Sequence, residues 1–271
     1  MNSPILAELD QKELEKIASN LPQSLLIVAS PGLDGEFTAK WLADQSPSEI
    51  MHITPLDKKT TISVDQIREL QQSVRTQPTT RRAIIIPSAQ IMTESASNAL
   101  LKLIEEPGEG THFILTANSQ ESLISTIISR CQIIKLHRTS PSQDKQLLDK
   151  SQLSDVQKQQ ILFLASGRPK LIRELASNEK LFAKYSQFAT DAKQLISSKS
   201  DYETLQTINK YAKDRQEALD FIDVLVNIIR FSMLSGGTNQ TLQSLLERIE
   251  ISEKSLKSNG NIKLSMMQLA I

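Results

Sequence analysis

The chain has 271 residues, and its 31 Lys and Arg residues balance its 31 Asp and Glu residues, so the formal net charge is zero. This length holds one large domain or a few small ones, with enough apolar residues for a buried core. The charge balance argues against a protein that holds nucleic acid by itself through a dominant basic field, but it does not exclude a small share in a multi-subunit DNA site. The single cysteine, Cys131, excludes a disulfide framework and argues against a cysteine-based zinc site.

Neither the start of the chain nor its densest apolar run predicts a membrane segment. The first twenty residues, MNSPILAELDQKELEKIASN, are charged throughout and contain no apolar signal core. The densest apolar run, LDFIDVLVNIIRFSML at 219–234, predicts a buried helix because polar residues interrupt it too often for a membrane span. These residues are Asp220, Asp223, Asn227 and Arg230. We therefore expect a soluble, cytoplasmic protein without a membrane partner.

Short apolar runs alternate with helical patterns along the first half of the chain. In chain order they predict a strand at 25–29 (LLIVA), a helix at 36–44, a weaker strand at 50–54, a helix at 63–75, a strand at 83–87 (AIIIP), a helix at 94–106, and strands at 113–117 (FILTA) and 132–136 (QIIKL). The strand runs lack strict alternation, as is typical of strands covered on both faces. Alternating strands and helices predict an α/β fold with a parallel sheet.

The helix at 94–106 has the clearest signals. Thr93 or Ser95 can cap its start, and Pro107 prevents it from continuing. Its apolar residues recur with helical spacing, so they share one face. That face consists of Ala96, Ala99, Leu100, Leu103 and Ile104.

The pattern changes at the polar segment 137–145 (HRTSPSQDK), and only helical periodicities follow it. A further loop signal, SGRP, interrupts them near residue 166. We therefore predict an α/β domain at 1–138, a small helical domain at 139–180 and a final helical domain at 181–271.

The segment that follows the first strand has the layout of a nucleotide-binding loop. Such a loop, G-x-x-x-x-G-K-[ST], surrounds phosphates with backbone N–H groups, neutralises them with Lys and binds Mg²⁺ with a hydroxyl. In SPGLDGEF (30–37), Ser30 replaces the first glycine and Gly35 is kept. Glu36 and Phe37 then replace the lysine and the hydroxyl residue. A charge pair about 4 Å apart near a protein surface is worth roughly 4 kcal/mol, so exchanging attraction for repulsion should abolish ATP–Mg²⁺ binding.

A second strand leads to the same conclusion. Nucleotide hydrolases of this architecture end another strand with an acidic pair, which binds magnesium and activates water. Here the strand at 83–87 ends in Pro87 and is followed by Ser88, and neither residue can do that chemistry. The loop after the first strand and the end of the strand at 83–87 thus both lack the side chains that bind and hydrolyse ATP. Taken alone, the first loop could also be an ordinary strand–turn–helix with a chance glycine.

Residues 83–136 resemble the clamp-loader branch of the AAA+ ATPases. They contain NALLKLIEEP (98–107), FILTAN (113–118) and SRC (129–131) in the order and spacing of that family. Weaker similarities extend the resemblance to SVDQIREL (63–70), SGRPKLIRELA (166–176) and NGNIKLSMMQL (259–269). The resemblance implies an AAA+ (RecA-like) parallel sheet flanked by helices, followed by an all-α lid and an all-α collar domain.

Within the family, the pattern of losses is similar to that of the delta-prime branch of bacterial DNA polymerase III. Motor subunits keep both phosphate-binding motifs and the SRC arginine, whereas delta-prime subunits typically keep only the arginine. This chain keeps Arg130 and lacks both motifs of its own. It departs from many relatives in lacking the four-cysteine zinc module, since 44–53 runs straight into the next strand.

The resemblance implies a role for the SRC segment. Arg130 would reach across a subunit interface to the γ-phosphate of ATP held by a neighbouring motor subunit, as an arginine finger. Ser129 and Cys131 would orient this loop and pack beneath it. The alternative interpretations are a surface arginine that caps a helix C-terminus and a plain buried thiol at Cys131.

The resemblance also implies the partners. We expect no cofactor on this chain, with ATP and Mg²⁺ held by the neighbouring subunit. The partners would be the clamp-loader ATPase subunits and the delta subunit, joined in a hetero-oligomer through the collar, with the sliding clamp contacted indirectly and primer-template DNA weakly. The implied function is a non-catalytic, stator-like subunit that helps load the clamp on primed DNA. An AAA+-like adaptor without a clamp-loading role and a self-contained ATPase are the alternatives.

Several other polar residues invite functional interpretations. The paired carboxylates Glu105 and Glu106 follow Lys102, but adjacent residues on a helix point in different directions. We therefore expect helix-end and subunit-packing roles rather than acid–base chemistry. Thr116 and Asn118 occupy the family's sensor position and should be structural where no nucleotide is bound.

The signals for further basic and metal-binding sites are weak. Lys170 falls near the arginine of the family's second sensor and should be idle. Arg81 and Arg82 form a compact basic pair, for which we expect a solvated position at the start of a strand rather than a DNA contact. The histidines lack the spacing of metal ligands, so we expect no metal site. They are His52, His112 and His137.

Overall fold

A computed structural model of the chain describes residues 4–45, 48–56, 59–74, 81–198, 200–236, 240–258 and 260–270. It divides into two compact units. The α/β unit consists of Met1–Leu147 with Gly167–Leu171, and the helical unit of Leu148–Ser166 with Ile172–Ile271. The predicted border between a lid and a collar near residue 180 stays a prediction.

The α/β unit is built on a five-stranded parallel sheet with the strand order β2-β3-β4-β1-β5. The strands are β1 (Ser24–Val28), β2 (Ser48–His52), β3 (Arg81–Ile86), β4 (Thr111–Ala117) and β5 (Gln132–Lys135). All the strands that the apolar runs predict are therefore confirmed, including the weaker one. The order places β1 between β4 and β5.

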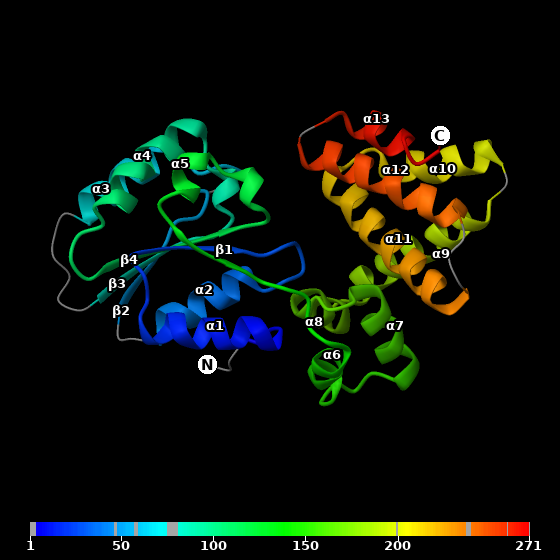
Figure 1. Cartoon of the computed structure of the whole chain (residues 1–271), viewed down its shortest axis with the longest axis horizontal. Helices are drawn as coiled ribbons and strands as arrows, with labels where there is room; N and C mark the ends of the chain where they lie inside the picture. Colours follow the sequence, from blue (N-terminus) through cyan, green and yellow to red (C-terminus); the bar gives the residue numbers. More distant parts are fainter. Residues whose placement is uncertain are drawn as a thin grey trace. The chain divides into compact units, whose positions relative to one another are not determined.

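Helices cover both faces of this sheet (Figure 1). The helices on one face are α1 (Glu8–Ser19) and α2 (Gly35–Asp44), and those on the other are α3 (Val64–Ser73), α4 (Glu94–Glu105) and α5 (Ser125–Ile128). The short 3-10 turns η1 (Ala89–Ile91) and η2 (Gln120–Ser122) follow β3 and β4. Each face has its own apolar core, which explains why the strands carry apolar side chains on both sides.

Local signals set the ends of the central helices. The hydroxyl of Thr93 accepts a hydrogen bond from the backbone N–H of Ala96 at 3.2 Å, which caps the start of α4. At α3, Ser63 and Gln66 form a capping box, with the Ser63 N–H 3.1 Å from Oε1 of Gln66. The predicted helices at 36–44, 63–75 and 94–106 are confirmed to within two residues, except that residue 75 lies outside the described residues.

The first helix, α1, is not among the predicted elements, and a buried carboxylate ties it to the chain beyond β5. Asp10 is 1% exposed and accepts hydrogen bonds from the backbone N–H of His137 at 2.6 Å and from its Nδ1 at 2.7 Å. Gln143 donates to the carbonyl of Leu6 at 2.6 Å. These bonds fix the segment that leaves the sheet against the start of the chain.

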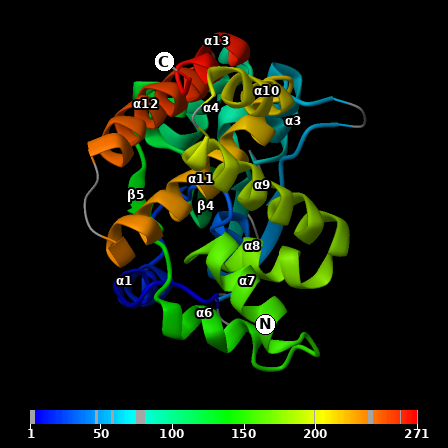
Figure 2. The same cartoon turned by 90° about the vertical axis from the view of Figure 1, so that its right-hand side faces the viewer.

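The second half of the chain is helical, as predicted. The helices are α6 (Pro141–Leu148), α7 (Asp155–Ala165), α8 (Pro169–Ser177), α9 (Glu179–Ser197), α10 (Asp201–Tyr211), α11 (Arg215–Gly236), α12 (Gln240–Lys257) and α13 (Ile262–Met267). In the helical unit, α9 lies alongside α11 (Figure 2). The run at 219–234 lies within α11 and buries residues such as Phe221 and Leu225, as predicted.

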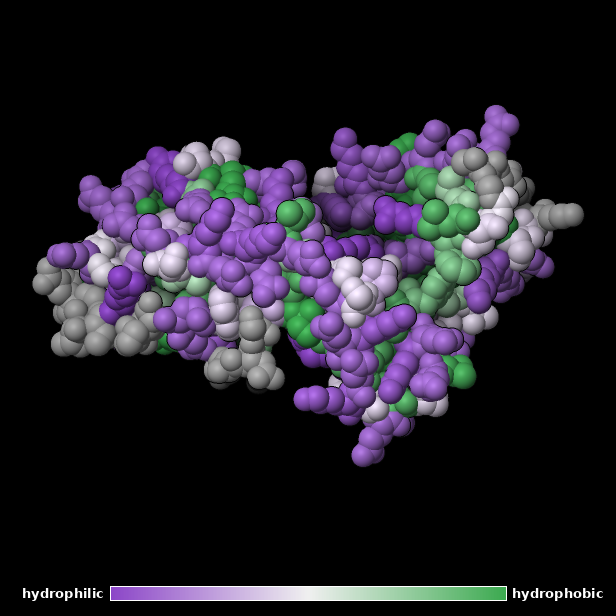
Figure 3. All heavy atoms as spheres, turned by 60° about the horizontal axis from the view of Figure 1, so that its bottom comes forward, coloured by the Kyte–Doolittle hydropathy of each residue, from purple (hydrophilic) through white to green (hydrophobic). Residues whose placement is uncertain are grey.

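A search for membrane-spanning helices over the described residues finds none that is long and apolar enough. On the face of the molecule drawn in Figure 3, hydrophilic residues predominate and apolar side chains are scattered. Single exposed apolar side chains of this kind are usual on protein surfaces.

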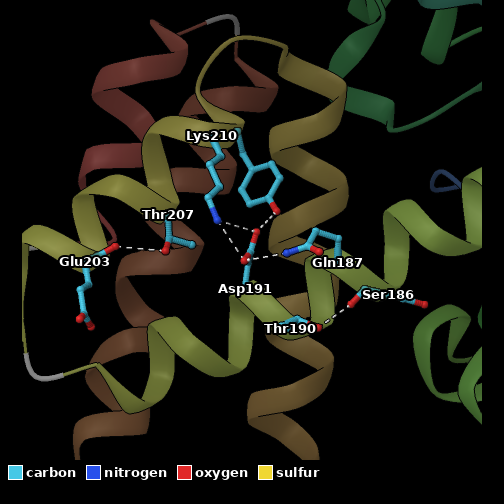
Figure 4. Close-up of polar contacts among 8 residues, drawn as sticks. Ser186, Gln187, Thr190, Asp191, Glu203, Thr207 and Lys210 are labelled. Carbon is cyan, nitrogen blue, oxygen red and sulfur yellow. Dashed lines mark hydrogen bonds and ion pairs between the residues drawn. The ribbon is translucent and has the colours of Figure 1, made fainter.

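A buried carboxylate joins two helices of the helical unit, and a third helix packs on one of its partners. Asp191 on α9 is 2% exposed and accepts hydrogen bonds from Gln187 at 3.0 Å and from Lys210 on α10 at 3.2 Å (Figure 4). Its other oxygen accepts from the hydroxyl of Tyr211, whose ring stacks on Phe221 of α11 at 4.3 Å. Burial and the neighbouring carboxylate raise the pKa of the Tyr211 phenol, so it stays a donor.

We expect Asp191→Ala to lower the free energy of unfolding by about 2–3 kcal/mol, because the buried Tyr211 hydroxyl loses its acceptor. Lys210 is half exposed, so the loss of its ion pair adds little. Urea unfolding followed by circular dichroism measures the change. The control is Gln187→Ala, which removes one neutral donor and should cost less than about 1 kcal/mol. Equal costs for the two variants would contradict the central role of Asp191.

Candidate functional site

The loop after β1 opens at a topological switch point of the sheet. β1 and β4 are neighbours with Val28 opposite Ala117, yet α2 follows β1 on one face and α5 follows β4 on the other. In parallel α/β sheets the crevice outside the carboxyl ends of such strands is where ligands bind. Residues 29–35 therefore occupy the place of a nucleotide-binding loop.

Protein contacts within the α/β unit occupy this loop. Gly32 has a φ of +88°, and its carbonyl accepts a hydrogen bond from the backbone N–H of Lys170 at 3.0 Å, in the first turn of α8. A Cβ at Gly32 would lie 2.9 Å from Cδ of the buried Arg168. The N–H of Leu33 donates to the carbonyl of Ser30 at 3.0 Å. The loop thus caps the start of α8 instead of presenting all its groups to a ligand.

The remaining loop residues also have packing explanations. A Cβ at Gly35 would lie 2.8 Å from Cβ of Ala29, so a glycine is needed here for the close approach of α2 to β1. Glu36 is exposed in the first turn of α2, where the helix dipole favours a carboxylate. Phe37 is partly exposed. None of these residues supplies the cation or the magnesium ligand of a phosphate loop.

The end of β3 faces the same crevice and is joined to β4. Pro87 is buried, and Ser88 has a left-handed backbone with a φ of 51°. Its N–H donates to the hydroxyl of the buried Thr116 on β4 at 2.9 Å. The geometry gives Thr116 a structural role, whereas Asn118 is exposed.

Arg130 lies at the other end of the strands, where β1 and β5 begin. It follows α5 and precedes β5, and β5 begins with Gln132 beside Leu25 near the start of β1. The loop at Ser30 follows the far end of β1. A strand rises about 3.3 Å per residue, so roughly 20 Å separate the two positions along the sheet. That distance exceeds the reach of an arginine side chain.

The guanidinium of Arg130 is held by groups of its own chain. Its Nε donates to Oε1 of Glu105 at 2.5 Å, and its Nη2 lies 2.5 Å from the same oxygen. Nη1 donates to the carbonyl of Thr126 at 2.9 Å and to the hydroxyl of Ser129 at 3.3 Å. The two charged side chains stay partly exposed, at 34% for Arg130 and 45% for Glu105.

The sequence does not predict this ion pair, since it indicates only a helix-end and packing role for Glu105. The order and direction of the strands and helices bring the two residues together. Helix α4 starts beyond the end of β3 and runs back towards the start of β4, so its last turn reaches the edge where β5 begins. There the hydroxyl of Ser24 donates to the carbonyl of Ile104 at 3.3 Å.

Cys131 packs its side chain against the core on the α4 face of the sheet. Burial raises the pKa of the Cys131 thiol from 9.0 to about 11. A thiol with such a pKa is a poor nucleophile at neutral pH. The geometry therefore favours the interpretation of Cys131 as a plain buried thiol.

One expectation about the basic pair at the start of β3 is wrong. Arg81 is exposed, but Arg82 is buried, and its Nε donates to Oε2 of Glu49 at 3.0 Å. The register places Glu49 directly opposite Arg82 on β2, which the sequence alone does not reveal. A search of the described residues for three or more His, Cys, Asp and Glu side chains grouped around a possible metal position finds no such group.

Parts of the chain are similar to known proteins. Residues 13–140 match the family model described as "DNA polymerase III, delta subunit". The chain is 36% identical over 127 residues to DNA polymerase III subunit delta' of Haemophilus influenzae, covering 45% of this chain and 38% of that protein. Identity to the Escherichia coli delta' subunit is 33% over 91 residues, covering 33% of this chain and 26% of that protein. The matches thus span less than half the length of these relatives.

A broader match and two solved structures extend the similarity to the helical half. The tau subunit of Bacillus subtilis is 24% identical over 241 residues, covering 79% of this chain and 41% of that protein. A gamma subunit-related protein of Thermotoga maritima has a TM-score of 0.56 at 20% identity, covering 96% of this chain and 97% of that chain. The RuvB Holliday junction branch migration motor of the same organism has a TM-score of 0.51 at 14% identity, covering 93% of this chain and 88% of that chain. These structures show the AAA+ fold, as predicted.

We expect Cys131 to react slowly with a disulfide reagent such as DTNB. A pKa of about 11 instead of 9.0 leaves about a hundredfold less thiolate at pH 8. Because the folded-state pKa is raised, the rate should keep increasing as the pH rises towards 11. The reaction is followed by absorbance, with the urea-unfolded chain as the control that regains ordinary reactivity. Fast modification of the folded chain at pH 8 would show that the thiol is accessible and activated.

Proposed function

We propose that the protein is a non-catalytic, stator-like clamp-loader subunit of DNA polymerase III, because its α/β unit is similar to the delta' subunits of that enzyme. In this role it supplies Arg130 as an arginine finger, in trans, to ATP held by a neighbouring ATPase subunit. The result is the loading of the sliding clamp on primed DNA.

The observation that carries this proposal is the position of Arg130 relative to the chain's own loop. The arginine lies at the edge of the sheet where β1 and β5 begin, and the loop at Ser30 lies where β1 ends. An arginine so placed has no access to a phosphate at its own loop. Its side chain is 34% exposed, which supports a contact with a nucleotide from another subunit.

The chemistry of the loop supports a chain that does not hydrolyse ATP itself. Glu36 places a negative charge where a phosphate loop has lysine, and Phe37 offers Mg²⁺ no oxygen. Gly32 is engaged with the start of α8, and Ser88 with Thr116. These contacts support a structural use of both motif positions.

An arginine contributes to phosphoryl transfer by stabilising the charge that develops on the transferred group. The guanidinium carries up to five N–H donors in a planar fork that matches phosphate oxygens. In Arg130, Nε and Nη2 bind Glu105, and Nη1 binds Thr126 and Ser129. The second N–H of Nη2 is left to donate to an anion.

The partners follow from the same role. We propose a hetero-oligomeric ring with clamp-loader ATPase subunits and a delta subunit, held together through the helical half of this chain. Several of its apolar side chains are exposed and can meet other subunits. They are Phe231, Leu234, Ile251 and Leu264. The neutral chain would contribute only weakly to DNA binding.

Arg130→Ala should leave assembly with the motor subunits intact and remove DNA-stimulated ATP hydrolysis at the interface it serves. An arginine finger is worth about 10³-fold or more in rate, so that interface should become silent. The measurement is steady-state hydrolysis by the reconstituted complex with clamp and primed DNA, with assembly checked by gel filtration.

Arg81→Ala is the matched control, because it removes an exposed positive charge elsewhere on the α/β unit and should preserve hydrolysis. If Arg130→Ala assembles and hydrolyses ATP at the full rate, the chain acts as an adaptor and not as the donor of an arginine finger.

The isolated chain should not bind ATP–Mg²⁺ measurably at micromolar nucleotide, since the loop lacks its lysine and its hydroxyl. Isothermal titration with a motor subunit as the positive control tests this expectation. Tight binding would overturn the non-catalytic role and favour a self-contained ATPase.

A further inference from the structure

We infer that Glu105 is a positioning residue for Arg130, and that it sets the guanidinium in the pose from which it meets a neighbour's phosphate. The inference rests on the proposed function of Arg130. It assigns a role to the EEP segment that closes α4. That segment otherwise presents only a helix end.

Glu105 and Thr126 hold the guanidinium of Arg130 from two sides. Both Nε and Nη2 of Arg130 lie 2.5 Å from one oxygen of Glu105, which fixes the side edge of the guanidinium plane. Nη1 donates to the carbonyl of Thr126 at 2.9 Å, which fixes its rotation. A charged donor and a charged acceptor at this separation form the stronger class of hydrogen bond. The plane is therefore held at two edges.

Secondary structure fixes the partners themselves. Thr126 belongs to α5, and Glu105 is the last residue of α4, whose end is tied to β1 by the bond from Ser24 to Ile104. Neither partner depends on a long loop. The pose of the arginine is thus set by elements that pack on the core of the sheet.

Holding the arginine side chain in advance reduces the conformational entropy that it loses during phosphoryl transfer. A free arginine samples many rotamers, and ordering it at the moment of phosphoryl transfer raises the barrier. A side chain held in advance avoids part of that cost. The ion pair is partly exposed, so its effect is limited to about fivefold, as for other exposed pairs.

The test uses the reconstituted clamp loader with primed DNA and clamp. The Arg130-dependent rate is defined as the rate of the complex minus that of the Arg130→Ala complex. Glu105→Ala should lower the kcat of this part up to about fivefold and leave the KM for ATP unchanged, because ATP is held by the neighbour. Glu105→Gln, which keeps an oxygen acceptor, should fall between the two.

Two controls separate positioning from a general loss of structure. Glu109→Ala removes an exposed carboxylate in the turn after α4 and should change neither kcat nor KM. The double variant Glu105→Ala with Arg130→Ala should match Arg130→Ala alone, since Glu105 acts only through the arginine. A further loss in the double variant would overturn the inference.

A measurement on the isolated chain tests the pair itself. The Nε–H signal of Arg130, assigned by its loss in Arg130→Ala, should exchange with water more slowly in the wild type than in Glu105→Ala. Equal exchange rates would show that the pair does not hold in solution and would overturn the inference.

The outcomes distinguish the two proposals. If Arg130→Ala impairs hydrolysis while Glu105→Ala preserves or raises it, the arginine finger stands and the positioning role of Glu105 is overturned. If Arg130→Ala leaves hydrolysis unchanged, the proposed function fails and the inference fails with it.

Discussion

The parallel pairing of β1 with β4 on one side and β5 on the other is the constraint on which the rest of the α/β unit depends. Because parallel strands share a direction, the segments that follow them lie together at their carboxyl ends. The segment that precedes β5 lies at their amino ends. The loop at Ser30, which follows β1, and the turn at Ser88, which follows β3, therefore both lie at the carboxyl ends of the strands. Arg130 lies at the amino ends of the strands, together with the end of α4. No rearrangement of side chains brings these two groups together.

The loop after β1 and the turn after β3 have backbone features that the packing of the α/β unit explains. Gly35 is needed for the close packing of α2 on Ala29, whatever the loop binds. Gly32 has a positive φ and a carbonyl that caps the start of α8. The N–H of Ser88 has a partner on β4. Each of these backbone features thus serves the fold.

The sequence predicts the elements that local patterns control. Apolar runs locate all the strands, and Thr93 marks the start of α4 within one residue. The sequence does not predict contacts between residues that lie far apart along the chain. Arg82 pairs with a carboxylate from another strand, and Asp10 binds a segment 127 residues away. Such pairs depend on register and on packing, which no local periodicity encodes.

The candidate site shows this division most clearly. Arg130 can be singled out from its motif, whereas its partner Glu105 cannot, since the two residues belong to motifs that are separate in the sequence. The structure joins them because α4 runs antiparallel to the strands and ends where β5 begins. A subunit that lends an arginine to another subunit's nucleotide does not need a nucleotide site of its own. Such a subunit would need a rigid support for its arginine, and in this α/β unit α4 and α5 hold the guanidinium of Arg130 through Glu105 and Thr126.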